Sequence, residues 1–143
     1  MIHISQINVF LQILEYLRKK GLKTIEMIEN ENAWNYRVAP KEFSVLETFH
    51  HTVKAIFEDA GNWFLNDSKP FKTSDNPIVD LNKSIDRMVA AIKDFTDEKI
   101  SEDFVFQWGE KTTIGEAITQ NLFHAAEHFS QLRGRVGICT RNK

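Results

Sequence analysis

The sequence predicts an all-α protein, a bundle of four helices that forms a single domain over residues 1–143. Four segments carry apolar residues at spacings of three and four, which places those residues on one face of a helix. Polar or proline-containing breaks separate the segments, and Ser/Thr-x-x-Glu capping boxes begin two of them. Because a chain of 143 residues can bury a core of its own, one bundle accounts for the whole sequence.

The first helix is predicted over residues 5–28. Ser5 is a residue type that caps a first helical turn, and Gly21 either permits a close helix contact or marks a bend. A polar connector follows over residues 30–43, and its aromatic residues are expected to lie over the end of the bundle. The apolar face of this helix consists of Phe10, Leu14, Leu17, Gly21, Ile25 and Ile28.

The second helix is predicted over residues 44–66, where Ser44 and Glu47 form a capping box. The third helix is predicted to begin at Asn76, a favourable N-cap, with Pro77 at the first helical position. Its regular apolar seam is typical of antiparallel packing in a bundle. The apolar stripes of these two helices are Val45, Phe49, Val53, Ile56 and Ala60, and then Ile78, Leu81, Ile85, Met88, Ile92 and Phe95.

An extended segment or small hairpin is predicted over residues 100–111, where alternating aromatic residues break the helical period. The fourth helix then starts at Thr113, which forms a second capping box with Glu116. It is expected to end near Gly137, so that Cys139 lies near a frayed terminus as an incidental surface thiol. The inner face of this helix consists of Ile118, Leu122, Ala125, Phe129, Leu132 and Val136.

Charge and composition exclude several classes of protein. The chain carries 18 basic and 20 acidic residues, a net charge of −2, and so lacks the basic surface of a nucleic-acid-binding protein. No apolar run approaches the roughly 20 residues of a membrane span, and the apolar start lacks the cleavage site of a secretory signal. The single cysteine cannot form an internal disulfide, which indicates a cytoplasmic protein.

Histidines are the candidate metal ligands, and His124 and His128 form the most informative pair. Their spacing of four residues is close to one helical turn, so both rings project from one side of the fourth helix, at the edge of its apolar stripe. Two neutral imidazoles placed in this way can chelate one divalent cation. Ala125 follows His124, so the HExxH motif and its metalloprotease base are absent.

A third ligand is expected from His50 or His51 on the second helix, and periodicity alone leaves both open. Three histidines and a water leave an open coordination position, which is typical of a catalytic rather than a structural site. The alternative interpretation of the spaced pair is two solvated surface histidines, and His3 is interpreted as a terminal surface residue.

Three fragments give the chain a family resemblance. The first is Ser44-Val45-Leu46-Glu47-Thr48-Phe49-His50-His51, and the second is Thr113-Ile114-Gly115-Glu116-Ala117. The third begins with His124-x-x-x-His128 and continues to Gln131. In this order and spacing they resemble the DinB (DinB/YfiT-like) superfamily of small metal-binding four-helix proteins. The match favours His51 over His50 as the ligand on the second helix. The chain departs from the family motif at Ser130, where a glycine is usual, and at Thr48, where an apolar residue is usual.

The resemblance implies an up-down-down-up bundle with a long crossover, often dimeric, whose His51, His124 and His128 bind zinc, nickel or iron. Some members of the family are thiol-dependent transferases or isomerases. The expected function is therefore that of a metal-dependent enzyme, either a thiol-dependent transferase or a small-molecule hydrolase. Its expected partners are a small-molecule substrate, such as a low-molecular-weight thiol, and a second copy of the chain. Membership of a fold family does not by itself establish an activity.

Two other functions stay open at this point. A non-catalytic metal-binding or stress-associated protein would use the same ligands, whereas a dimeric structural bundle without metal would have histidines that point apart. Glu47 and Glu116 are interpreted as cap partners and Glu127 as a solvated residue. Gln131 could orient a bound water or a histidine ring. No residue is assigned as the catalytic acid or base.

Overall fold

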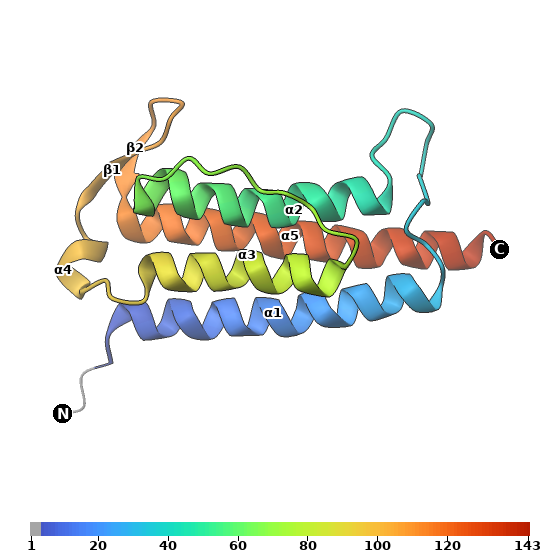
Figure 1. Cartoon of the computed structure of the whole chain (residues 1–143), viewed down its shortest axis with the longest axis horizontal. Coiled ribbons are helices and arrows are strands. Elements are labelled where there is room, and N and C mark those ends of the chain that lie inside the picture. The colour runs from blue at the N-terminus through green and yellow to red at the C-terminus, as the bar shows by residue number, and fades with distance from the viewer. Residues whose placement is uncertain (1–3) are drawn as a thin grey trace.

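The computed structural model describes residues 4–143, so His3 lies outside the described residues. Four long helices lie side by side, and a short helix and a two-stranded hairpin lie at one end of the bundle (Figure 1). A π-helical turn, η1, continues directly from α2. The elements are α1 (Gln6–Asn30), α2 (Val45–Asp59), η1 (Ala60–Leu65), α3 (Pro77–Ile92), α4 (Asp97–Ile100), β1 (Asp103–Val105), β2 (Lys111–Thr113) and α5 (Ile114–Arg141).

The order of the helices confirms the predicted bundle. In Figure 1, α1 and α5 run in one direction and α2 and α3 in the other, with a long crossover between η1 and α3. Each long helix contacts two of the others, since α1 packs on α3 and α5, and α2 packs on the same two. None of the helices within residues 4–143 combines the length and the apolar character that a membrane span requires.

The predicted apolar stripes of the four helices point into the core, with one exception. Ile78 is 47% exposed, so its assignment to the seam of α3 is wrong. The first turn of α3 instead buries Asp80, whose carboxylate accepts hydrogen bonds from the backbone N–H of Ser74 in the crossover. The fully buried side chains include Leu14, Ile28, Phe49, Ile56, Leu81, Ile85, Met88, Ile92, Ile118, Phe129 and Leu132.

The first turns of the helices are stabilised in different ways. The capping box of α2 is confirmed, because the Ser44 hydroxyl accepts from Glu47 N–H and the Glu47 carboxylate accepts from Ser44 N–H, both at 3.1 Å. In α5 only half of the predicted box forms: Thr113 accepts from Glu116 N–H, and the Glu116 carboxylate bonds to a neighbouring threonine hydroxyl. The hydroxyl of Ser5 makes no cap bond. The N–H of Gln6 donates instead to a carboxylate of α4.

The predicted extended segment before the last helix forms a small antiparallel hairpin, with Phe104 opposite Thr112. Its aromatic side chains pack against the π-helical end of the second helix. The Trp63 ring lies 5.9 Å from the Phe104 ring and 5.2 Å from the Phe106 ring, measured between centroids. The hairpin therefore covers the bundle end where α5 begins.

The C-terminal end of α5 differs from the prediction. The helix continues to Arg141, and Cys139 is buried in the core, so neither fraying at Gly137 nor a surface thiol is correct. The reason is the connector between α1 and α2, which covers this end of α5. Its Tyr36 packs against the core, and its hydroxyl accepts a hydrogen bond from the side chain of Asn142.

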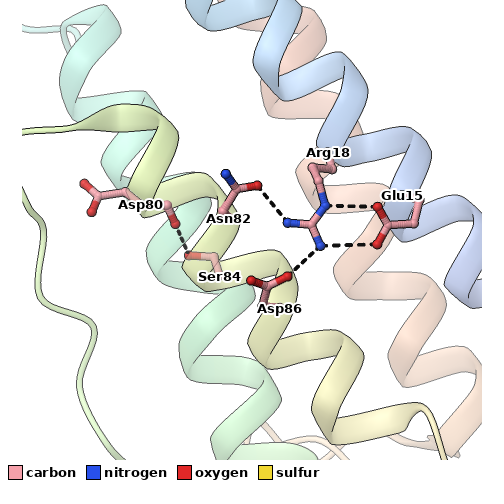
Figure 2. Close-up of polar contacts among 6 residues, drawn as sticks. All are labelled: Glu15, Arg18, Asp80, Asn82, Ser84 and Asp86. Atoms are coloured by element: carbon pink, nitrogen blue, oxygen red, sulfur yellow. Dashed lines mark hydrogen bonds and ion pairs between the residues drawn. The ribbon is translucent and has the colours of Figure 1, made fainter.

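A polar cluster joins α1 to α3 on the flank of the bundle (Figure 2). The guanidinium of Arg18 donates to Asn82 Oδ1 and Asp86 Oδ1, each at 2.7 Å, and to both oxygens of Glu15. Because one planar group satisfies acceptors on two helices, these bonds fix how α1 lies along α3.

Gly21 lies where α1 approaches its neighbours closely, as the sequence suggested. A methyl group added there would lie 2.8 and 2.9 Å from the methyl carbons of Leu81 and 3.2 Å from the ring of Phe129. We expect Gly21→Ala to lower the free energy of unfolding by about 1–3 kcal/mol despite the higher helix propensity of alanine, because both neighbours are fully buried. Urea unfolding followed by circular dichroism measures the change.

The matched control is Gly134→Ala in α5, where an added methyl group meets nothing within 4 Å. This variant should gain about 0.5–1 kcal/mol from helix propensity alone. An equal gain in Gly21→Ala would show that the close contact of α1 does not limit packing.

Candidate metal centre

Three histidines meet between α2 and α5. His51 from α2 and His124 and His128 from α5 each offer one ring nitrogen, and these nitrogens lie within 4.8 Å of one another. The Nε2 atoms of His124 and His128 are 3.0 Å apart. The centroid of the His51 ring lies 5.4 Å from that of His124 and 5.1 Å from that of His128. The rings therefore converge instead of pointing apart.

The packing of α2 against α5 produces this convergence. Thr52 and Val53 are buried on the α2 side, and Ala125 and Phe129 are buried on the α5 side. The histidines flank these residues, so their rings lie at the rim of the interface, with His51 the most exposed of the three. Ala125, in the turn between the two α5 histidines, is small and fully buried.

The structure distinguishes the two candidates on the second helix. His51 lies beside the α5 pair, whereas His50 is absent from the cluster and its ring lies near that of Phe49. His50 lines a separate cleft with Phe43 and Lys54, which His51 borders as well. A metal site built from His51, His124 and His128 is thus geometrically possible.

Burial keeps two of the rings neutral. Desolvation is the main cause that lowers the pKa of His51, followed by the nearby His128 and then Lys54. Desolvation also lowers the pKa of His124, reinforced by His128 and His51 and opposed by Glu127. At neutral pH these imidazoles therefore hold free lone pairs, the form in which histidine binds a metal.

Gln131 orients the ring of His128, which is one of the two roles predicted for it from the sequence. Its Oε1 lies 3.1 Å from His128 Nδ1, and because an amide oxygen can only accept, Nδ1 carries the proton. In this ring orientation Nε2 faces the cluster, 3.0 Å from His124 Nε2. This arrangement is the usual support of a metal-binding histidine, whose second nitrogen donates to a fixed acceptor.

We expect Gln131→Leu to weaken zinc binding by about 10–100-fold while the fold is retained, because His128 loses the acceptor that fixes its tautomer. Isothermal titration calorimetry with zinc measures the affinity. Gln120→Leu is the control, since this exposed glutamine of α5 lies outside the cluster. Equal affinities for the two variants would show that Gln131 does not support the ring.

Two solved structures share the architecture of this chain. The crystal structure of the DinB-like protein YjoA from Bacillus subtilis has a TM-score of 0.67 and 20% sequence identity, over 87% of this chain and 89% of that chain. The crystal structure of a DinB-like protein from Bacillus cereus ATCC 10987 has a TM-score of 0.62 and 16% identity, over 99% and 94%. The chain has a DinB-like fold. No family model matches the sequence, and no curated protein matches it.

The donor set of the DinB-like bundle suits a divalent transition metal. Imidazole nitrogens are ligands that zinc, nickel and iron accept, and three protein ligands leave one coordination position for water or substrate. A cleft of about 300 Å³ lies beside His51 and His128 and gives access from solvent. No carboxylate belongs to the cluster among the described residues. Glu127 is exposed, in agreement with its solvated interpretation.

A buried polar pair below the histidines was not found from the sequence. Asn121, one turn before His124, donates its Nδ2 to Asp59 Oδ2 at 2.9 Å. Desolvation raises the pKa of Asp59 to about 6, although the bond from Asn121 opposes the shift. Asn121 Oδ1 is buried and has no hydrogen-bond partner among the described residues. The sequence signal for this pair was the amide of Asn121, which lies between Ile118 and Leu122 of the buried apolar stripe.

Arg135 is a further residue that the sequence did not single out. It lies seven residues after His128 on α5, and its Nη1 donates to the hydroxyl of Thr48 at 2.6 Å. Both residues line the cleft beside the histidines. The signal was a cation on the histidine side of α5, two turns further along the helix.

Proposed function

We propose that this protein binds one divalent metal ion, zinc, nickel or iron, through His51, His124 and His128 and works as a metal-dependent enzyme. The observation that supports this proposal is the convergence of three ring nitrogens within 4.8 Å, two of them on rings whose pKa values burial lowers. The reaction we propose is thiol-dependent transfer or the hydrolysis of a small molecule.

The residues of the centre have distinct tasks in this proposal. A bound divalent ion would lower the pKa of a thiol or water and so supply a nucleophile at neutral pH. Gln131 holds the His128 ring with Nε2 toward the cluster, and the low pKa of His124 keeps its lone pair free. The exposed side of His51 and the adjoining cleft leave room for a small molecule. No residue is assigned as the general base.

The experiment starts with cobalt(II), which reports its ligands through its visible spectrum. We expect the protein to bind one equivalent, and His51→Ala to lose it while His50→Ala retains it. Addition of a low-molecular-weight thiol should then produce a thiolate-to-cobalt absorption band. A thiol-transfer assay and a hydrolase assay on the zinc-loaded protein, against a panel of electrophiles and esters, separate the two reactions.

Two results would favour the alternatives. Metal binding without a thiol band and without turnover would indicate a non-catalytic metal-binding or stress-associated protein. Failure to bind any divalent metal would favour a structural bundle, although that function predicts histidines that point apart, the reverse of the observed convergence. A cytoplasmic location is part of the proposal and is supported by the unpaired thiol of Cys139.

We also propose a homodimer through the outer face of α1 and α5. A stripe with alternating spacings of three and four runs along the outside of α5, and its one large apolar side chain, Phe123, is 64% exposed. A shallow groove of about 430 Å³ separates it from the exposed Ile13 and Tyr16 of α1. The members of the α5 stripe are Glu116, Thr119, Phe123, Ala126, Ser130 and Arg133.

The charges of this stripe suit contact with the same stripe of a second copy of the chain. Glu116 and Arg133 lie equally far along α5 from the midpoint between Phe123 and Ala126. In an antiparallel dimer with its two-fold axis at that midpoint, Glu116 of each protomer lies opposite Arg133 of the other, as a self-complementary interface requires.

Arg133→Glu is expected to weaken the dimer by about tenfold or more, because two like-charge pairs replace two ion pairs. The double variant Glu116→Arg/Arg133→Glu should restore it. Sedimentation equilibrium measures both dissociation constants. A single variant as dimeric as the parent, or a double variant weaker than the single one, contradicts the proposed register.

A further inference from the structure

We propose that the cleft beside the histidines binds a small molecule with an oxyanion group, a carboxylate or phosphate, and that Arg135 holds this group. The reactive end of the molecule then faces His51 and His128. This inference rests on the proposed function, since it names the class of substrate for the same site, but the anion subsite consists of its own residues.

The first support is the position of the guanidinium. Arg135 lies on the same cleft as His51 and His128. Its Nη1 donates to the hydroxyl of Thr48, which precedes His51 by three residues and therefore lies on the same side of α2. Arginine side chains on a helix lean toward the helix N-terminus, so Arg135 extends back toward His128. The guanidinium thus lies about one turn from the histidine cluster.

The second support is the charge of Arg135. It is half-buried, and its one hydrogen bond among the described residues is to the neutral Thr48 hydroxyl. The guanidinium groups of Arg18, Arg37 and Arg87 differ, since each forms an ion pair with a carboxylate. Arg135 therefore retains a full positive charge and unused donors in a cleft that a small molecule can enter.

The surroundings of the cleft leave that charge uncompensated. Lys41 lines the cleft as a second cation, and Glu42 is the one carboxylate among its lining residues. Glu42 forms no ion pair with Arg135 within the described residues. A planar guanidinium with free donors matches a carboxylate or phosphate in two parallel hydrogen bonds, which a lysine cannot reproduce.

Thr48 gives the inference a further basis in the sequence. Its side chain carries a hydroxyl three residues before His51 on α2. That hydroxyl is the group that accepts from Arg135, and its residue is buried. The buried hydroxyl and the arginine without an ion pair are thus parts of one feature, a guanidinium held in a fixed orientation over the cleft.

The test compares thiols that differ only in charge, on the cobalt(II)-loaded full chain. The probes are 3-mercaptopropionate and 6-mercaptohexanoate, each against the alcohol of the same length, with the thiolate-to-cobalt band as readout. We expect at least one acid to bind about tenfold or more tightly than its alcohol. Arg135→Gln should remove this preference, Arg135→Lys should retain part of it, and Thr48→Val should reduce it.

Lys93→Gln removes one positive charge from the exposed end of α3 and is the matched control, which should keep the full preference. Thermal unfolding of each variant checks that the fold is intact, and Arg135→Lys keeps the test decisive if Arg135→Gln does not fold. Equal binding of acids and alcohols by the parent protein, or a preference that survives Arg135→Gln, overturns the inference.

Failure of the metal site can be recognised separately. If the protein does not bind cobalt, the proposed function fails, and the anion subsite is then tested on the metal-free protein with inorganic phosphate. The ¹⁵N–¹H signal of the Arg135 Nε group should shift during the titration, and Thr48→Val should weaken the effect. An unchanged signal at saturating phosphate overturns the inference as well.

Discussion

His124→Ala is expected to lower the affinity of the protein for zinc by more than about 100-fold. This loss is larger than the one expected for Gln131→Leu, which removes only a residue that supports a ligand. The Nε2 atoms of His124 and His128 lie 3.0 Å apart, so the removal of one ring leaves only two candidate ligands, on different helices. The fold should persist, because the ring lies at the rim of the α2–α5 interface and is only partly buried. Titration calorimetry with zinc measures the affinity, and circular dichroism checks the fold.

His50→Ala is the matched control for this change, since His50 neighbours the cluster but does not belong to it. The control should bind zinc with the affinity of the parent. If His50→Ala releases the metal and His51→Ala does not, the ligand from α2 is wrong. If His124→Ala binds as well as the parent, the centre is not built from these three rings.

Asp59→Asn is expected to stabilise the protein by about 1–3 kcal/mol at pH 7.5, because it removes a carboxylate that is costly to charge. Desolvation raises the pKa of Asp59 to about 6 in the folded state, whereas an unfolded aspartate titrates near pH 3.9. The asparagine amide can also donate to Asn121 Oδ1, which lacks a partner among the described residues.

The raised pKa of Asp59 also determines how its contribution to stability changes with pH. Between about pH 4 and pH 6 the folded protein holds one more proton at Asp59 than the unfolded chain, so the contribution of Asp59 to stability falls as the pH rises. The advantage of Asp59→Asn should therefore be smallest near pH 4, grow to about pH 6 and then level off. The histidine titrations cancel, since parent and variant share them.

Urea unfolding of parent and variant at several pH values measures this difference. Asp67→Asn is the control, because its hydrogen bond with Arg87 is the main cause that lowers the pKa of Asp67. That variant should gain no stability at pH 7.5. An Asp59→Asn difference that is constant from pH 4 to pH 7.5 would contradict the raised pKa.

Local signals were sufficient to predict the helices. Burial selects one face of a helix, so the spacing of apolar residues predicted α1, α2, α3 and α5. The capping box of Ser44 and Glu47 also predicted the residue at which α2 begins. Errors arose where a distant segment decided the outcome. Cys139 is buried near the end of α5 that the α1–α2 connector contacts through Tyr36, and Ile78 is exposed in the turn where Asp80 meets the crossover.

The candidate site required more than periodicity. The spacing of His124 and His128 placed both rings on one side of α5, but the choice of His51 over His50 depended on the rotation of α2 against that helix. The bond between Arg135 and Thr48 depends on the same packing, because its two residues are distant in the chain. Helical spacing carries no information about which turns of two helices lie at the same level.

The two helices that supply the histidines are separated in the chain by the crossover, α3 and the hairpin. An ion shared by His51 and His124 would therefore act as a removable cross-link that closes residues 51–124, about half of the chain, into a ring. Such a link restricts the unfolded chain and must be released before the helices separate. The lifetime of the folded state in the cell would then follow the supply of the metal.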